Sequence, residues 1–343
     1  KASEEAQAIM NTERRKPLKF LITYIFVEKD KNAVASLHAT LQTEGYGARV
    51  GQDIRVVNST FEAQSDAIIA AIRDRSPRAG RAVISLDQYG YKEVPTSLIR
   101  RLLGQLPRAE ILLTFAVDAF INFASDNLLT HRMLDHLGMP DVLKGRTLAD
   151  IKANEADYRL FIQSCLYQGL IQGCGAHYYT LFFIKTQGHG DYWLVHLSQH
   201  PRARDVMTQV HWENNNHFIH YGGPGLDMFQ VLGYSAKNDE QFTGQGALAF
   251  GFDEPANQAS VTLLTEQLVR LVREREAIRF GELYASTCNT TPADSQRYRN
   301  ALELLIAHKE IAIVGPNGAR RQKATTIGDE DIVRMANQKV FNF

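Results

Sequence analysis

The chain has 343 residues, more than one average domain, so two or three folding units are expected. Apolar residues make up 44% and charged residues 22%, which is typical of a globular protein with a sizeable core. The 38 Lys and Arg residues balance the 38 Asp and Glu residues, so any affinity for nucleic acid must come from local charge. No apolar run reaches the roughly 18 residues of a membrane span. Three widely spaced cysteines favour a reducing, cytoplasmic setting over a disulfide framework.

The first 125 residues alternate between runs of β type and helical patterns. Strands are predicted at residues 18–27, 54–57, 82–86 and 111–116, and helices at residues 32–41, 61–72 and 95–103 and after Asp118. An alternation of this kind implies right-handed crossovers and a parallel sheet. The sequence therefore predicts an α/β fold.

A different pattern follows this alternation. Residues 126–176 are polar and helical in character, and we interpret them as an insertion that caps the strand ends. Residues 178–185 and 192–197 then form two strands joined by a hairpin loop. A parallel sheet closed by an antiparallel hairpin is typical of class I methyltransferases. We therefore assign residues 1–125 and 177–200 to a Rossmann-like domain of that type and residues 201–260 to a connector.

The last part of the chain, residues 261–343, has the outline of a winged helix. An apolar stripe predicts a helix from residue 261, a shorter helix follows at 280–286, and residues 291–294 cap a third that ends near 308. Strands at 310–314 and 319–327 then flank the glycine-containing turn at 315–318. Three helices followed by a hairpin indicate a winged-helix domain.

Several stretches of the sequence resemble one family, the three-Cys-motif partner proteins of bacteria and phages. The stretches that carry the resemblance are residues 26–30, 86–95, 113–118, 193–207 and 323–327. The match extends from about residue 18 to the end of the chain. It implies a methyltransferase-like domain, S-adenosylmethionine as cofactor and a partner protein with a three-cysteine motif.

One departure from the family pattern concerns the start of the chain. Family members carry an upstream strand that ends in a glycine turn, which would hold the methionine part of S-adenosylmethionine. Residues 1–16 instead have a helical pattern, and the first residue is not Met. In the doubly wound order the missing strand would lie in the middle of the sheet, so its absence would leave a hole in the core. We therefore expect the native chain to contain a further N-terminal segment.

Two polar residues at predicted strand ends are candidates for cofactor binding. Glu28 ends the first strand, where an acid can accept hydrogen bonds from ribose hydroxyl groups, or it is a solvated loop acid. Asn58 follows the second strand and could contact an adenine edge, although helix capping by Asn58 or Ser59 is favoured.

Asp87 and Tyr89 are the candidates for chemistry. They follow the third strand and loosely resemble the Asp-Pro-Pro-Tyr motif, in which the acid binds an exocyclic amine and the aromatic ring stacks on a base. Gln88 replaces the first proline, and Gly90 separates the two tyrosines. The alternative role of Asp87 is to shape the loop.

Clustered cations mark the terminal domain as a candidate for nucleic-acid binding. In a winged helix the third helix enters the major groove and the wing contacts the backbone. The candidate residues are Arg297, Arg299, Arg320, Arg321 and Lys323. Acids at 329–331 reduce the local charge, and winged helices also serve as protein-binding domains.

Six of the eleven histidines lie between residues 189 and 220, but no ligand spacing suggests a metal site.

The sequence leaves two candidate functions for this protein. The first is an S-adenosylmethionine-dependent methyltransferase that acts on DNA or RNA with a three-Cys-motif partner. The alternative is a non-catalytic adaptor that binds nucleic acid or protein through the winged helix.

Overall fold

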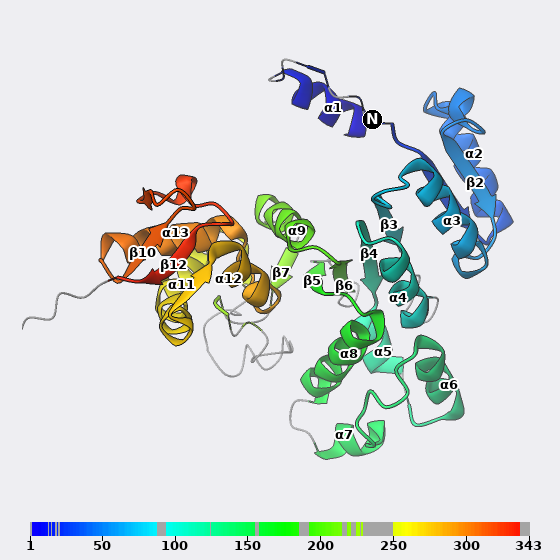
Figure 1. The fold of residues 1–343 in the computed structure, drawn as a ribbon. Helices are drawn as coiled ribbons and strands as arrows, with labels where there is room; N and C mark the ends of the chain where they lie inside the picture. Colours follow the sequence, from blue (N-terminus) through cyan, green and yellow to red (C-terminus); the bar gives the residue numbers. More distant parts are fainter. Residues whose placement is uncertain are drawn as a thin grey trace, which may run out of the picture. The chain divides into compact units, whose positions relative to one another are not determined.

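The structure is a computed structural model. It describes residues 2–87, 94–154, 158–184, 192–214, 218–220, 224–226, 228 and 250–336, except for positions 13, 15, 18, 20 and 124. The chain divides into two compact units, Lys1–Asp74 and Arg75–Phe343 (Figure 1). Among the described residues, no helix combines the length and the hydropathy that crossing a membrane requires.

The first unit is built around two parallel strands. Its elements are α1 (Ala2–Thr12), β1 (Tyr24–Glu28), α2 (Lys31–Thr43), β2 (Ile54–Asn58) and α3 (Phe61–Arg75). Strands β1 and β2 pair in parallel register, as the intervening helix predicts. Asp30 caps α2 by accepting the Asn32 and Ala33 N–H groups. At the start of α3 the Thr60 hydroxyl accepts the Ala63 N–H. The helix cap is therefore Thr60, and the predicted capping by Asn58 or Ser59 is wrong because it lies one or two residues too early.

The second unit contains a six-stranded sheet in the order β3-β4-β6-β5-β7-β8. Strands β3 and β4 are parallel, and every other neighbouring pair is antiparallel. The predicted hairpin is present, and its second strand pairs with β4. The predicted parallel strands thus fall into two sheets, so a single methyltransferase-type sheet stays a prediction. The strands are β3 (Ala82–Leu86), β4 (Ala109–Phe115), β5 (Tyr178–Ile184), β6 (Tyr192–Ser198), β7 (Phe218–His220) and β8 (Phe250–Gly251).

Helices follow β3 and β4 and fill the segment predicted to be helical. They are α4 (Thr96–Gln105), α5 (Val117–Phe123), α6 (Leu128–Leu137), α7 (Leu148–Asn154) and α8 (Tyr158–Cys174). Pro95 lies at the N-cap of α4 rather than at its first position. Asp118 is the second residue of α5 and not its cap, because the helix begins at Val117. The buried Thr96 hydroxyl donates to the Leu137 carbonyl and joins the start of α4 to the end of α6.

The C-terminal region contains three helices and a small sheet, drawn from yellow to red in Figure 1. The sheet order β11-β10-β12-β9 includes two short strands, β9 and β12, that the sequence did not predict. Strand β11 is also shorter than predicted and leads into a 3-10 turn at Ala324–Thr326. Helix α9 (Pro201–Glu213) precedes this region. The elements of the region are α11 (Glu254–Arg275), β9 (Ala277–Arg279), α12 (Phe280–Thr287), α13 (Ser295–Ala307), β10 (Ile311–Val314), β11 (Arg320–Arg321) and β12 (Ile332–Met335).

One apolar core holds these three helices and this sheet together. Residues of α11, α12 and α13 meet residues of β10 and β12 in it, among them Leu264, Leu268, Leu283, Tyr298, Leu302, Leu305, Ile311, Ile313 and Val333. The sheet closes the core on one side because alternate residues of β10 point inward. This is the architecture of a winged helix, with α13 as its third helix and β10–β11 as the wing.

Candidate nucleic-acid interface

Helix α13 has a buried face and an outward face. Asp294 caps it by accepting the Arg297 N–H, and Tyr298, Leu302 and Leu305 are buried in the core. On the outward face, Gln296 is exposed and Asn300 is half-buried. Their amides are joined, since Gln296 Nε2 donates to Asn300 Oδ1 over 2.9 Å.

Arg297 is directed into the protein. Its guanidinium group lies 3.4 Å from the centre of the Trp212 ring and pairs with Asp294 at 3.0 Å. Only 14% of the side chain is exposed, and burial lowers the pKa of the guanidinium group. Arg297 therefore joins α13 to α9, and a contact with nucleic acid would require it to leave these partners.

Arg299 is also held by internal contacts. It donates to the Ile327 carbonyl at 2.9 Å and to the Ser295 hydroxyl at 2.7 Å, and it lies over the Phe280 ring. A longer ion pair of 3.4 Å links it to Asp329. The guanidinium group thus fastens the turn after the wing to α13.

Arg321 belongs to the wing but binds a buried carboxylate. Its Nε and Nη2 atoms donate to the two oxygens of Asp331 at 2.9 and 3.1 Å. Burial by itself would raise the pKa of Asp331, but the hydrogen bonds from Arg321 and from the Gly328 N–H hold this pKa below its ordinary value. The pair therefore fixes β11 against the start of β12.

The other two wing cations are directed outward. Arg320 and Lys323 are exposed, and neither has an acidic partner within the part of the chain that the structure describes. The three acids that follow the wing are each paired with an arginine: Asp331 with Arg321, Asp329 with Arg299 and Glu330 with Arg279. Glu303 of α13 instead accepts the Ala324 N–H, next to Lys323. The outward positive charge of the wing therefore comes from Arg320 and Lys323.

The predicted cofactor residues lie together in the first unit. Glu28 and Asn58 are opposite each other at the carboxyl ends of β1 and β2. Asn58 Nδ2 donates to the Glu28 and Lys29 carbonyls at 2.9 and 3.0 Å, and Glu28 Oε1 accepts the Asp30 N–H at 2.7 Å. Both side chains therefore shape the loop after β1.

Asp87 lies at the end of β3, in the second unit. It is exposed, and its Oδ1 atom accepts a hydrogen bond from the Thr114 hydroxyl of β4 at 2.8 Å. This contact fits the loop-shaping role and leaves the second oxygen of the carboxylate for another donor. Tyr89 lies outside the described residues, so the pairing of Asp87 with Tyr89 stays a prediction.

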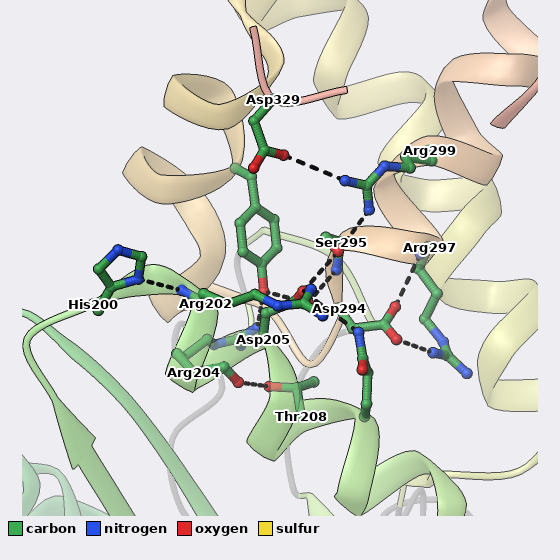
Figure 2. A network of polar contacts seen from close by, with 12 residues as sticks. His200, Arg202, Arg204, Asp205, Thr208, Asp294, Ser295, Arg297, Arg299 and Asp329 are labelled. Carbon is green, nitrogen blue, oxygen red and sulfur yellow. Dashed lines mark hydrogen bonds and ion pairs between the residues drawn. The ribbon is translucent and has the colours of Figure 1, made fainter. Parts of the chain in front are cut away.

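A buried polar network joins α9 to the start of α13 (Figure 2). Arg204 is fully buried and donates to the Tyr284 hydroxyl and to the carbonyls of Ala293 and Thr291. Asp205 accepts the Ser295 N–H at 2.7 Å, the Ser295 hydroxyl at 2.8 Å and the Tyr284 hydroxyl at 3.1 Å. We call these contacts, together with that of Trp212, the α9 junction.

The indole of Trp212 completes the α9 junction. Its Nε1 atom donates to the Pro292 carbonyl at 2.9 Å, while its ring lies against Arg297. A buried arginine and a buried aspartate are costly unless they are hydrogen-bonded, and here both are. The α9 junction therefore holds the winged helix to the helix that follows β6.

The histidines of this region are structural where the structure describes their side chains. His200 caps α9 by accepting the Arg202 N–H. His196 is buried in β6 and lies 3.0 Å from Glu110, and His211 is buried in α9 near Thr180. Within the described residues, no group of three His, Cys, Asp or Glu side chains is placed to hold a metal ion.

The comparison with protein families agrees with the geometry of the C-terminal region. Residues 233–318 match the family model of the GMT-like wHTH domain. The described part of this match includes α11, α12, α13 and β10. A winged-helix domain related to the GMT family is therefore supported here, and it is consistent with nucleic-acid binding. No curated protein matches the chain.

The outward amides of α13 were missed at the sequence level. The search for cations selected Arg297 and Arg299, whereas the structure places Gln296 and Asn300 on the outward face. Their spacing of four residues in a predicted helix is the signal that could have found them, because such residues share one face.

Proposed function

We propose that this chain binds duplex nucleic acid through its winged helix, with the wing on the phosphate backbone. The observation that carries the proposal is the pairing of Asp329, Glu330 and Asp331 with arginines. Because each of these acids lies beside an arginine, their charges oppose those of Arg320 and Lys323 less, and these two exposed cations attract phosphates.

The roles of the five predicted cations differ in this proposal. Arg320 and Lys323 contact the nucleic acid. Arg297, Arg299 and Arg321 hold the domain together through the Trp212, Ile327 and Asp331 contacts, and they position α13 and the wing. Substitution of these three would test stability and binding at once, so they are poor probes of the interface.

The first prediction concerns the salt dependence of binding. Each neutralised phosphate contributes about 0.9 to the slope of log affinity against log salt. We expect the double variant Arg320→Ala/Lys323→Ala to bind a 20-base-pair duplex more weakly and to lose nearly two units of this slope. Fluorescence anisotropy of a labelled duplex over a range of salt concentrations measures both effects.

The control for this experiment removes two other exposed cations from the same unit. Arg108 precedes β4 and Arg132 belongs to α6, and both are exposed outside the winged helix. The variant Arg108→Ala/Arg132→Ala has the same net charge as the wing variant. If both double variants show the same decrease in duplex affinity and in salt slope, binding depends on the overall charge of the protein, and the wing is not the binding site.

We further propose that the α/β part of the chain is methyltransferase-like, binds S-adenosylmethionine and acts on nucleic acid with a three-Cys-motif partner. Support comes from Glu28 and Asn58, which face each other at the carboxyl ends of parallel strands. The remaining side-chain acceptors fit a nucleoside. The other carboxylate oxygen of Glu28 suits a ribose hydroxyl, and the side-chain amide oxygen of Asn58 suits an adenine amine. When bound, the cofactor supplies the methyl group; Asp87 and Tyr89 would orient the acceptor base.

The second prediction tests this proposal by isothermal titration calorimetry with S-adenosylhomocysteine. We expect binding to wild-type protein and a loss of roughly tenfold or more in Glu28→Ala, because a charge-assisted hydrogen bond is removed. Glu62→Ala removes an exposed acid from α3 of the same unit and should change nothing. An absence of heat from wild-type protein favours the adaptor function instead.

A further inference from the structure

Helix α13 presents an uncharged polar face, although its sequence contains two arginines. Arg297 and Arg299 are directed to Trp212 and Ile327, so their charges do not contribute to the outward face. The face instead carries the amides of Gln296 and Asn300, followed one turn later by Leu304, which is 44% exposed. Asn and Gln amides can bind adenine in the major groove, and an apolar side chain can contact the thymine methyl group.

The hydrogen bond between the two amides determines which groups remain for a ligand. Gln296 Nε2 donates to Asn300 Oδ1, so the amide oxygen of Gln296 and the amide nitrogen of Asn300 stay available. One acceptor and one donor on two linked amides match the major-groove edge of adenine, where the 6-amino group donates and N7 accepts. An exposed leucine suits the methyl group of the paired thymine.

We propose that α13 reads an adenine–thymine pair in the major groove of B-form DNA through Gln296 and Asn300. The 6-amino group of adenine donates to Gln296 Oε1, and Asn300 Nδ2 donates to N7. This inference rests on the proposed nucleic-acid binding and adds the base and the type of duplex. RNA duplexes are excluded as equal ligands because their major groove is too deep and narrow for a helix.

The test begins with selection of preferred sites by the full chain from a pool of randomised 20-base-pair DNA duplexes. We expect the selected sites to share an adenine–thymine pair at a fixed position. That adenine is then replaced by 7-deazaadenine, which removes N7 and leaves base pairing and the minor groove intact. Wild-type affinity should fall roughly tenfold.

Variants identify the side chain that makes this contact. Asn300→Ala should bind the natural site roughly tenfold more weakly and should be indifferent to 7-deazaadenine, because the donor to N7 is gone. Gln258→Ala is the matched control, since Gln258 is an exposed glutamine on α11 of the same domain. It should keep the full sensitivity of the wild-type protein.

The outcomes separate this inference from the proposed function. Binding that depends on Arg320 and Lys323 but shows no adenine preference, ignores 7-deazaadenine or is equally strong for RNA duplexes overturns the inference alone. Absence of any duplex binding overturns both. An Asn300→Ala variant that keeps wild-type sensitivity to 7-deazaadenine removes this residue from the contact and overturns the assignment.

Discussion

His211 is a histidine that the fold keeps uncharged. Its ring packs edge-on against Phe182 at 4.4 Å between centroids and stacks with Phe252 at 5.9 Å. Burial, followed by the nearby His196 and Arg204, lowers the pKa of His211 to about 3. The side chain therefore remains neutral in the folded protein at pH values where an exposed histidine is protonated.

This burial predicts a loss of stability in mild acid. Between a pKa of about 6.5 in the unfolded chain and about 3 in the folded one, only the unfolded state binds a proton at His211. The free energy of unfolding should therefore fall with decreasing pH, by up to about 1.4 kcal/mol per pH unit, and should not change through this group above pH 6.5. Urea unfolding at several pH values measures the slope.

A pair of variants assigns this slope to His211. His211→Phe keeps an aromatic ring among Phe182 and Phe252 but cannot be protonated, so the acid slope should become shallower. His308→Gln removes an exposed histidine at the end of α13 and should leave the slope unchanged. An unchanged slope in His211→Phe would show that another group causes the acid sensitivity.

The sequence indicates which residues are charged and helical better than it indicates their contacts. The positions of Arg297 and Arg299 on a helix were predicted, but not their contacts with Trp212 and Ile327, which lie 85 and 28 positions away. Contacts of this kind depend on tertiary packing, which a helical period does not encode. The search for exposed cations therefore selected two arginines that stabilise the domain.

The close approach of helices α4 and α8 depends on a glycine, Gly173, which has no side chain. A Cβ atom on Gly173 would lie 2.6 Å from Thr96 Oγ1 and 2.7 Å from Thr96 Cβ. Thr96 cannot turn away without losing its buried hydrogen bond to the Leu137 carbonyl. Gly173 therefore sets the distance between the two helices.

We expect Gly173→Ala to destabilise the protein by roughly 1–3 kcal/mol, as overpacking of a buried contact does. Gly104→Ala is the matched helical control, because a Cβ atom there meets nothing within 4 Å. It should stabilise α4 by about 0.5–1 kcal/mol. Thermal unfolding of both variants measures the difference, and equal shifts in midpoint would contradict the close approach.

The predictability of an element follows from its length and its apolar content. Residues 82–86 were predicted as a strand with the bounds that the structure shows, because an apolar run ends there at a charged residue. Strands β9 and β12 were missed, since they have three and four residues and each contains an exposed arginine. They exist because they pair with each other and because β12 pairs with β10.

The α9 junction connects the winged helix to the rest of the second unit, because it joins α13 to α9, the helix that follows β6 of the six-stranded sheet. Asp205 is 2% exposed and accepts hydrogen bonds from Ser295 and Tyr284, whereas its ion-pair partner Arg202 is 64% exposed. In the sequence these two residues look alike, as charged positions of one helix. Their difference arises only when α9 meets the start of α13.

We expect Asp205→Ala to lower the free energy of unfolding by about 3 kcal/mol, because buried donors of Ser295 and Tyr284 lose their acceptor. Arg202→Ala removes the exposed partner of the same carboxylate and should cost less than about 1 kcal/mol. Calorimetric unfolding distinguishes the two. A small effect of Asp205→Ala would show that the α9 junction contributes little to holding the winged helix in place.

Trp212 gives the protein an optical reporter of its own. The chain has two tryptophans, and the other, Trp193, is buried in β6 against Phe115. In a Trp193→Phe variant, all indole emission would come from beneath the Arg297 guanidinium group, beside the start of α13. Any ligand that pulls α13 away from α9 would let water reach this ring and shift its fluorescence to longer wavelength, so movement at this place can be followed without an added dye.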